Sequence, residues 1–326
     1  MISDLKSAAV QLVQAGIRQS TKRTYLSVQK QFLEFCNVYS LCPVPASEVT
    51  LLLYITHLNG KGMAHASVLV QLAGIRNLHV EQGYGEPIVA CPQIKQALRA
   101  IKEQAPATKK KSPIKLPLLI EMWDLLKGTS HELLWKAVLS LAFFGGLRGS
   151  EYSATQANSS GAPLLNSIHF MRITGSVVMQ YKVPQSKTQA KGMLITYGCS
   201  LHTVCPVCAV KDYFNLRYSL SRVSLQEPLF LYKNRPVSKN DVDAVIKSLI
   251  KSMGLPPEEY SAHSLRAGVA SSAAEAGFKD WEVQELGGWQ SKVYQSYIRD
   301  IRLHRAQFAK RLIKHAIKTH HEHTQS

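Results

Sequence analysis

The sequence predicts a mainly α-helical protein with a small antiparallel β-sheet, divided into two domains. Apolar residues recur at three- and four-residue spacing through the first hundred positions, which is typical of amphipathic helices. A Pro- and Lys-rich stretch then interrupts the pattern, and three β-rich runs follow it. We therefore expect a helical bundle at 1–104, a basic linker at 105–117 and an α+β domain at 118–326. A length of 326 residues suits two domains of ordinary size.

Four helices are expected in the N-terminal bundle, and each carries one apolar stripe. Ser20 and Ser47 stand where an N-cap is needed, and Pro92 suits a first turn. The four stripes are Tyr25, Val28, Phe32 and Phe35; Val49, Leu52 and Ile55; Leu69, Leu72, Ile75 and Leu78; and Ile94, Leu98 and Ile101. No side chain of the bundle looks catalytic. Its basic residues are expected on polar faces, with contact to a nucleic-acid backbone as the more specific alternative; they are Lys22, Arg23, Lys61, His65 and Arg76.

The second domain mixes both periodicities. A helical apolar run that ends at Gly145-Gly146 precedes three strands, of which the last two form a hairpin with a polar tip at 185–192. The expected helices are 118–127, 131–144, 207–219, 240–253, 264–276, 281–287 and 301–318, and the expected strands are 167–174, 176–183 and 193–199.

Charge indicates the class of partner. The chain has 39 Lys+Arg against 22 Asp+Glu, a formal charge of +17, and its 45% hydrophobic content permits a folded core. The longest apolar run, 133–147, contains Lys136 and is shorter than the ~20 residues of a membrane span. No secretory signal is evident and the six cysteines are scattered, so we expect an intracellular protein that binds a polyanion.

Two basic stretches are candidates for the polyanion contact. We expect the linker lysines Lys109, Lys110, Lys111 and Lys115 to follow a phosphate backbone between the two domains. The second stretch lies at 299–318, where a solvated helix face is the plainer interpretation.

Potential metal ligands recur every third residue at Cys199, His202, Cys205 and Cys208. Cys-x-x-Cys is a common half of a zinc site, but structural sites normally draw their ligand pairs from separate segments. We favour free thiols here and keep zinc as the alternative. Five histidines between 304 and 323 have no partner segment, and we expect neither a metal nor another cofactor in the reaction.

A more specific set of residues can surround a phosphate. Arg148 follows the end of an apolar helix and precedes Glu151 by three positions, and His263 and Arg266 share one face of a helix start. Lys187 occupies the hairpin tip. Arginine offers bidentate bonds and a permanent charge, and histidine moves protons near pH 7. Each feature alone also fits a plain structural role, such as an ion pair at a helix end.

Aromatic residues complete this set. Trp289 follows the Gly287-Gly288 break, and Tyr294 and Tyr297 come soon after it. A tyrosine becomes a nucleophile only when cationic neighbours or a base activate its phenol.

The order and wording of these motifs resemble the tyrosine recombinase (phage integrase) superfamily. The quoted segments are "GGLRGSE", "HSLRAG" and "ELGGWQSKVYQSYIR", and the last is most like recombinases of DIRS-, Ngaro- and Crypton-type mobile elements of eukaryotes. The resemblance implies a core-binding (SAM-like) helical bundle and an α+β catalytic domain, joined by the linker. It departs from the usual wording at Gly288, where arginine is common, and at Ala267, where bacterial members often have histidine.

The resemblance also implies a role for each matching residue. Arg148 and Arg266 would hold the scissile phosphate, Lys187 would protonate the leaving 5′-oxygen, and His263 would assist proton transfer. Trp289 would replace a frequent histidine, and Glu151 would orient the site. Tyr297 would form a 3′-phosphotyrosyl link, and Tyr294 is the rival nucleophile.

The expected function is therefore site-specific cleavage and rejoining of double-stranded DNA, for integration or excision of a mobile element. Exchange between two DNA sites implies a homo-oligomer, a tetramer, located in the nucleus of a eukaryote or otherwise in the cytoplasm or nucleoid. The alternatives are a domesticated DNA-binding protein without cleavage and a relaxing topoisomerase of similar mechanism.

Overall fold

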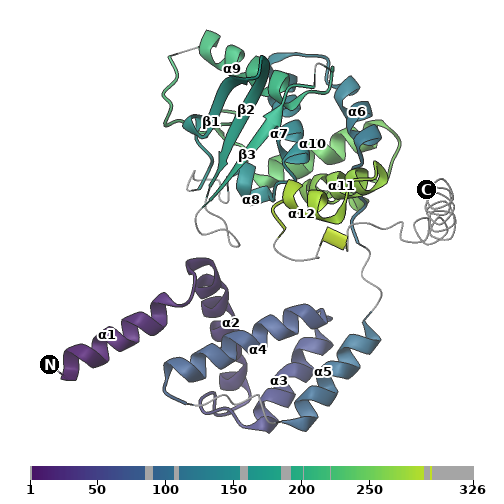
Figure 1. Cartoon of the computed structure of the whole chain (residues 1–326). Helices are drawn as coiled ribbons and strands as arrows, with labels where there is room; N and C mark the ends of the chain where they lie inside the picture. The colour runs from purple at the N-terminus through teal and green to yellow at the C-terminus, as the bar shows by residue number, and fades with distance from the viewer. Residues whose placement is uncertain are drawn as a thin grey trace, which may run out of the picture. The chain divides into compact units, whose positions relative to one another are not determined.

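The computed structural model divides the chain into two compact units, Met1–Thr108 and Lys109–Ser326 (Figure 1). It describes residues 2–84, 91–105, 110–154, 161–184, 192–200, 202–220, 222–289 and 294–295. Within these ranges no helix combines the length and the apolar character that crossing a membrane requires.

The N-terminal unit is helical throughout its secondary structure. Its helices are α1 (Ile2–Ala15), α2 (Gln19–Val38), α3 (Glu48–Gly60), α4 (His65–Glu81) and α5 (Pro92–Gln104). Helix α2 packs against α4, and α3 packs against α5. The predicted cap at Ser47 is confirmed, because its side chain accepts a hydrogen bond from the Thr50 amide at 3.1 Å.

Packed aromatic and aliphatic side chains form the core of this unit. Phe32, Leu51 and Ile75 come from three different helices and are fully buried. The buried polar ring of His79 in this core is paired, as burial requires. The buried ring of His79 bonds the Ile75 carbonyl through Nδ1 and the Ala46 amide through Nε2, both at 2.8 Å. The bundle is therefore a self-contained packing unit.

The C-terminal unit combines helices with two small antiparallel sheets. Its helices are α6 (Leu116–Leu125), α7 (Ser130–Phe144), α8 (Gly149–Tyr152), α9 (Pro206–Leu220), α10 (Lys239–Ser252), α11 (Ala262–Glu275) and α12 (Asp280–Leu286), with short 3₁₀ turns at Leu165–Ser167 and Pro257–Glu259. Its strands are β1 (Ile168–Ile173), β2 (Ser176–Val183), β3 (Met193–Gly198), β4 (Leu231–Tyr232) and β5 (Arg235–Pro236). The order of the main sheet is β1-β2-β3, as in two successive hairpins. The predicted fold class, mainly α with a small antiparallel sheet, is confirmed.

Helix α7 is the central element of the C-terminal unit. Its residues from Leu134 to Phe143 are buried with one exception, Lys136, and the helix packs against both α9 and α11 (Figure 1). It ends at Gly145 and Gly146, where the sequence predicts its end. The positive φ of Gly146, +55°, suits the left-handed turn that redirects the chain toward Arg148.

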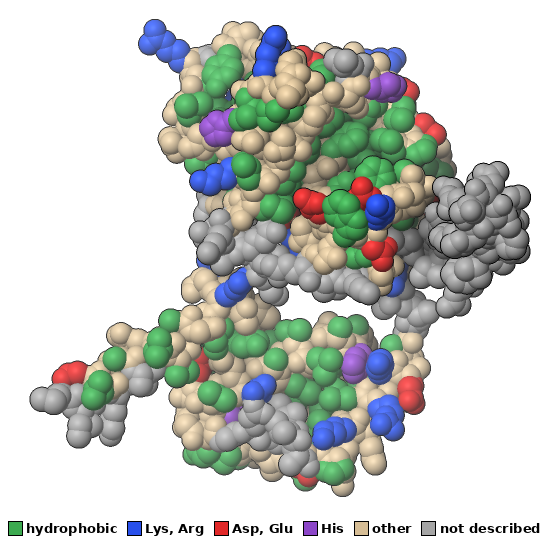
Figure 2. All heavy atoms as spheres, viewed as in Figure 1, with side chains coloured by type: hydrophobic (Ala, Val, Ile, Leu, Met, Phe, Trp, Pro, Cys, Tyr) green, Lys and Arg blue, Asp and Glu red, His purple; other side chains and the backbone are tan. Residues whose placement is uncertain are grey.

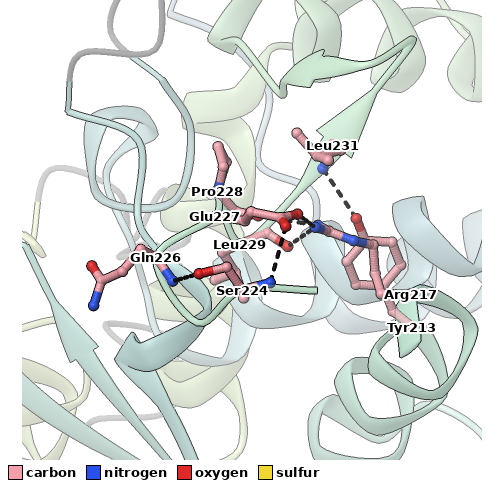
Figure 3. Close-up of polar contacts among 8 residues, drawn as sticks. All are labelled: Tyr213, Arg217, Ser224, Gln226, Glu227, Pro228, Leu229 and Leu231. Atoms are coloured by element: carbon pink, nitrogen blue, oxygen red, sulfur yellow. Dashed lines mark hydrogen bonds and ion pairs between the residues drawn. The ribbon is translucent and has the colours of Figure 1, made fainter. Parts of the chain in front are cut away.

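A buried arginine fixes the loop between α9 and β4 (Figure 3). Arg217 donates to the Glu227 carboxylate at 2.6 Å and to the Pro228 carbonyl at 3.1 Å, with 9% of its side chain exposed. In the same loop, the carbonyl of Glu227 accepts a hydrogen bond from the Leu165 amide at 2.9 Å. These bonds satisfy the arginine within the fold, so we assign it a structural role.

The end of the predicted linker is bound to the C-terminal unit. Residues 110–115, which we call the docked strap, run beside α11, where the amide of Ser112 donates to the Glu259 carbonyl at 2.7 Å and that of Ile114 to the Ser264 carbonyl at 2.9 Å. A Cβ on Gly268 of α11 would overlap the Ile114 carbonyl. Glycine at that position therefore permits the strap to approach the helix closely.

Candidate active site

A buried carboxylate fixes Arg148 at the start of α8. Glu151 is 1% exposed and accepts two hydrogen bonds from Arg148, one from the backbone amide at 2.7 Å and one from Nη1 at 2.9 Å. The arginine side chain keeps 32% of its surface exposed. Its guanidinium is therefore oriented by the protein and still accessible to an anion.

Two tyrosines of the main sheet hold this corner against α7. The hydroxyl of Tyr181 in β2 donates to the Glu151 carbonyl, and that of Tyr197 in β3 donates to the Leu141 carbonyl at 3.1 Å. A Cβ on Gly145 would overlap the Tyr197 hydroxyl. The sheet thus fixes the backbone on both sides of Arg148, and the first glycine of the "GGLR" segment is needed for that packing.

Arg266 connects the three motif segments. Its Nη1 donates to the carbonyl of Gly146, and its Nη2 donates to the carbonyl of Gly287 at 3.0 Å. Its guanidinium also lies over the Trp289 ring, 4.4 Å from the centroid. With 2% of its surface exposed, Arg266 joins the segments before Arg148 and before Trp289 to α11. A phosphate contact would require part of this guanidinium to become accessible.

The two glycine pairs allow these segments to meet. A Cβ on Gly146 would lie 3.0 Å from the Cα of Gly287, and one on Gly287 would overlap the Trp289 ring. Gly288 has a φ of +56°, in the left-handed region that glycine adopts without strain. This geometry gives a physical reason for glycine where the recombinase wording usually has arginine.

His263 lies in a cluster of positive charge. It is exposed at the start of α11, three residues before Arg266. Desolvation of its ring and the charge of Arg266 lower the pKa of His263, and Lys239 and Arg148 act in the same direction. The ring is therefore neutral near pH 7, able to accept or share a proton.

Sequence analysis did not single out Lys239. It is the first residue of α10 and follows the N-cap Ser238. Its aliphatic carbons pack over Gly149: a Cβ added to that glycine would lie 3.4 Å from the Lys239 Cγ. This packing brings its ammonium close enough to influence His263. The capping sequence Ser238–Asp241 could have predicted that Lys239 begins a helix, but it could not have predicted how far Lys239 lies from Arg148.

Trp289 and Tyr294 are packed inside the unit. Trp289 is 5% exposed and Tyr294 is 1% exposed, with their ring centroids 5.9 Å apart. Burial and the nearby Asp280 raise the pKa of the Tyr294 phenol. A buried phenol beside a carboxylate is poorly suited to nucleophilic attack, which weakens the case for Tyr294.

Three residues of the predicted set lie outside the described residues. They are Lys187 of the hairpin, Tyr297 and the linker residue Lys109. The structure therefore brings together Arg148, Glu151, His263, Arg266 and Trp289, and their roles in a reaction stay predictions.

The other basic candidates lie in both units. On the N-terminal unit, Lys22 and Arg23 are the fourth and fifth residues of α2, Lys61 follows α3 and His65 begins α4. On the docked strap, Lys110 and Lys111 are exposed. Lys111 also donates to the carbonyl of Glu258, and Lys115 pairs with Glu275. Lys111 and Lys115 thus have partners on their own unit, which competes with the expected contact to phosphate.

Helix α5 carries a further basic face that sequence analysis missed. Lys95, Arg99 and Lys102 are exposed at i, i+4 and i+7, and Figure 2 shows Lys and Arg side chains gathered over this helix. Residues at this spacing share one helix face, so the sequence pattern could have predicted the stripe.

The described geometry is chemically suited to a phosphate ester. An oriented arginine, a neutral histidine, a lysine and a second arginine converge where α8, α10 and α11 begin. Such an arrangement holds an oxyanion through fixed positive charge while the histidine moves a proton.

Comparison with known proteins agrees with this class. The phage integrase family model matches residues 206–301, which include His263, Arg266, Trp289 and Tyr297. The integrase/recombinase XerD homolog of Selenomonas ruminantium is 24% identical over 263 residues, covering 78% of this chain and 74% of the relative.

Solved structures share the fold at low sequence identity. The Tn1549 transposon integrase in complex with transposon right end DNA has a TM-score of 0.61 at 14% identity, covering 93% of this chain and 97% of that one. XerH recombinase bound to a palindromic difH substrate has a TM-score of 0.56 at 15% identity, covering 85% of this chain and 75% of that one. A lambda integrase dimer bound to a COC′ core site has a TM-score of 0.53 at 16% identity, covering 92% of this chain and 77% of that one. Over residues 206–301 the chain is similar to the phage integrase family, and its fold is shared with these recombinase and integrase structures.

Proposed function

We propose that this protein is a site-specific DNA recombinase or integrase that cuts and rejoins DNA strands through a tyrosine. One observation carries the proposal: Arg266 bonds the carbonyls of Gly146 and Gly287, which joins three motifs that are far apart in sequence into one cationic site. The comparisons support it, since the similar proteins include recombinases and a transposon integrase.

The chemistry needs no external energy source. The phenol oxygen of Tyr297 attacks phosphorus, the 5′-oxygen leaves with a proton, and a 3′-phosphotyrosyl ester forms. Arg148 and Arg266 stabilise the charge that develops on the phosphate oxygens. Lys187 is the proposed donor to the leaving oxygen, and His263 is the proposed partner in proton transfer. Attack by another 5′-hydroxyl reverses the step and joins the strands.

Nearby cations extend the contact with DNA. The charge of Lys239 acts on His263 together with that of Arg148, and we assign the Lys239 ammonium to a phosphate next to the reacting one. The α5 stripe is a second candidate for backbone binding. Lys239→Gln should weaken DNA binding and make it less dependent on salt, because one fewer counterion is released. Lys251→Gln at the other end of α10 is the matched control.

Covalent trapping tests the proposal. On a nicked suicide substrate, the short fragment that carries the released 5′-hydroxyl diffuses away, so the phosphotyrosyl adduct accumulates and survives denaturing electrophoresis. We expect an adduct with the natural sequence and with Tyr294→Phe, and none with Tyr297→Phe. An adduct that persists in Tyr297→Phe and is lost in Tyr294→Phe would overturn the assignment of the nucleophile.

The burial of Arg266 favours one alternative, a DNA-binding protein that does not cleave. Both of its Nη atoms are bonded to carbonyls and 2% of its surface is exposed. DNA binding without an adduct, on substrates that carry the natural target site, would support this alternative and refute the recombinase.

Three finer proposals accompany the function. Strand exchange between two duplexes favours a tetramer, and deletion of residues 306–326 should abolish tetramer assembly on DNA while sparing binding to a single site. The "SYIR" wording favours origin in a DIRS-, Ngaro- or Crypton-type element, which sequencing of the flanking DNA for terminal repeats tests. A eukaryotic host would place the protein in the nucleus, which microscopy of a tagged protein tests.

A further inference from the structure

Three cysteine thiols meet where strand β3 leads into helix α9. The Sγ of Cys199 lies 3.7 Å from the Sγ of Cys205 and 3.7 Å from that of Cys208, and all three sulfurs lie within 4.8 Å of one another. Among the described residues of the chain this is the one cluster of His, Cys, Asp or Glu side chains with such spacing.

The sulfur distances match those around a tetrahedral zinc ion. With Zn–S bonds of about 2.3 Å, two sulfurs at corners of a tetrahedron lie ~3.8 Å apart. A disulfide requires about 2.05 Å and uses two thiols, whereas three thiols approach one another here. Contacts between thiols are weak, so they give little reason by themselves for three cysteines to converge.

The fold, rather than the short segment alone, places the three cysteines. Cys199 is anchored to the sheet, because its amide donates to the Val177 carbonyl at 3.1 Å. Cys205 directly precedes α9 and is buried, whereas Cys208 is exposed in the first turn of that helix. The end of a strand and the start of a helix thus contribute the cysteines separately, as structural zinc sites normally require, although the residues are close in sequence.

Charge at the helix start favours thiolates. The N-terminus of α9 carries the positive end of the helix dipole, which stabilises anions in its first turn. Cys208 lies in that turn and Cys205 directly precedes it, and thiolates are the zinc-binding form of cysteine.

We propose that Cys199, Cys205 and Cys208 bind a structural zinc ion, with His202 as the fourth ligand. The four residues form a Cys₃His set, and three of them are already grouped. His202 is exposed in the loop between Cys199 and Cys205, and Nδ1 lies 3.2 Å from the Thr203 hydroxyl. When Nδ1 carries the proton and donates to that hydroxyl, Nε2 has the lone pair that a metal needs. In this tautomer Nδ1 no longer accepts the weak 3.4 Å hydrogen bond from the Val204 amide.

The ion would join the sheet to α9 and would stand apart from the reaction. Cys199 follows the strand that carries Tyr197, whose hydroxyl positions the backbone before Arg148. Zinc at this place therefore stabilises the frame of the site without contacting a substrate.

Elemental analysis of the full chain tests the site. Protein purified under reducing conditions should contain one zinc per chain, and Cys208→Ser, at an exposed position, should lose it while remaining folded. Cys42→Ser, which removes an exposed thiol of the N-terminal unit, should keep the zinc. His202→Ala should bind zinc more weakly by at least tenfold in a chelator competition; unchanged affinity would overturn that ligand.

Cobalt substitution and mass measurement separate the other outcomes. Co²⁺ bound by three thiolates gives intense visible bands and thiolate charge-transfer absorption, which Cys208→Ser should abolish. Reduced protein that takes up neither metal, or zinc content equal in Cys208→Ser and the natural sequence, would refute the site. A mass two daltons below that of the reduced chain, with no metal bound, would identify a disulfide instead.

Discussion

Replacing Glu151 with glutamine tests how Arg148 is held. The carboxylate is 1% exposed and accepts both the Arg148 amide at 2.7 Å and Nη1 at 2.9 Å. Glutamine keeps the shape and one acceptor oxygen, but its NH₂ group faces the other donor. A hydrogen bond to a charged group contributes roughly 1.5–3 kcal/mol, so the free energy of unfolding should fall by about 2 kcal/mol. At about 2–4 °C per kcal/mol for a unit of this size, Tm should fall by ~4–8 °C.

Cleavage should respond more strongly than binding. Arg148 would keep its charge but lose its fixed orientation, so we expect adduct formation on a suicide substrate to slow by roughly 10–100-fold, equivalent to about 1.4–2.8 kcal/mol. Affinity for the same DNA should change by less than about threefold, because most of it comes from other phosphates.

Glu132→Gln is the matched control for this experiment. Glu132 accepts the Thr129 amide at 2.8 Å in the same capping geometry, at the other end of α7, ~20 Å from Arg148 by the rise of the helix. It should cleave DNA at the natural rate. Equal rates for Glu151→Gln and the natural sequence, or equal losses in both variants, would refute the reasoning.

Three further changes probe the frame of the site. In Gly268→Ala the new methyl overlaps the Ile114 carbonyl, so the docked strap should detach and trypsin should cut it several-fold faster; an unchanged digestion pattern would contradict this contact. His263 has a lowered pKa in the folded state, so the unfolded chain binds its proton more readily and stability falls as pH drops through about 6.5 and below. Urea unfolding should show a smaller loss between pH 7 and 5 for His263→Asn, and identical pH profiles would argue against it. Arg217→Met should lose about 2–3 kcal/mol of unfolding free energy through its bonds to Glu227 and two carbonyls, while the folded fraction cleaves normally.

Local patterns predicted most of the regular structure. The run 176–183 alternates and is bounded by Gly175, and β2 has these same limits. The apolar run before Gly145-Gly146 ends where α7 ends, and Ser47 caps α3 as its type predicts. Such features depend on neighbours within a few residues, which one sequence displays directly. The four predicted helices of the bundle do not include α1, whose Leu5 and Leu12 are exposed and form no buried stripe.

Long-range contacts explain what sequence analysis missed. Motif order brought Arg148, His263 and Arg266 into one hypothesis, but their physical arrangement depends on partners far along the chain. The carbonyls that hold Arg266 lie 120 residues before it and 21 after it. The same is true of Lys239, whose position over Gly149 arises from packing between α8 and α10. No periodicity in a single sequence encodes such pairs.

The two carbonyls that Arg266 binds, those of Gly146 and Gly287, are far apart in sequence, and this separation affects how the protein is made. A ribosome adds about 5–20 residues per second, so Gly146 is synthesised roughly 7–28 s before Gly287, whose carbonyl is the other partner of Arg266. During that interval Arg148 already exists, but its neighbourhood is incomplete. The proposed nucleophile, Tyr297, comes later still. A chain made only as far as Arg148 thus has basic groups but lacks the residues proposed to break DNA, and the proposed cutting activity can arise only after Tyr297 has been added.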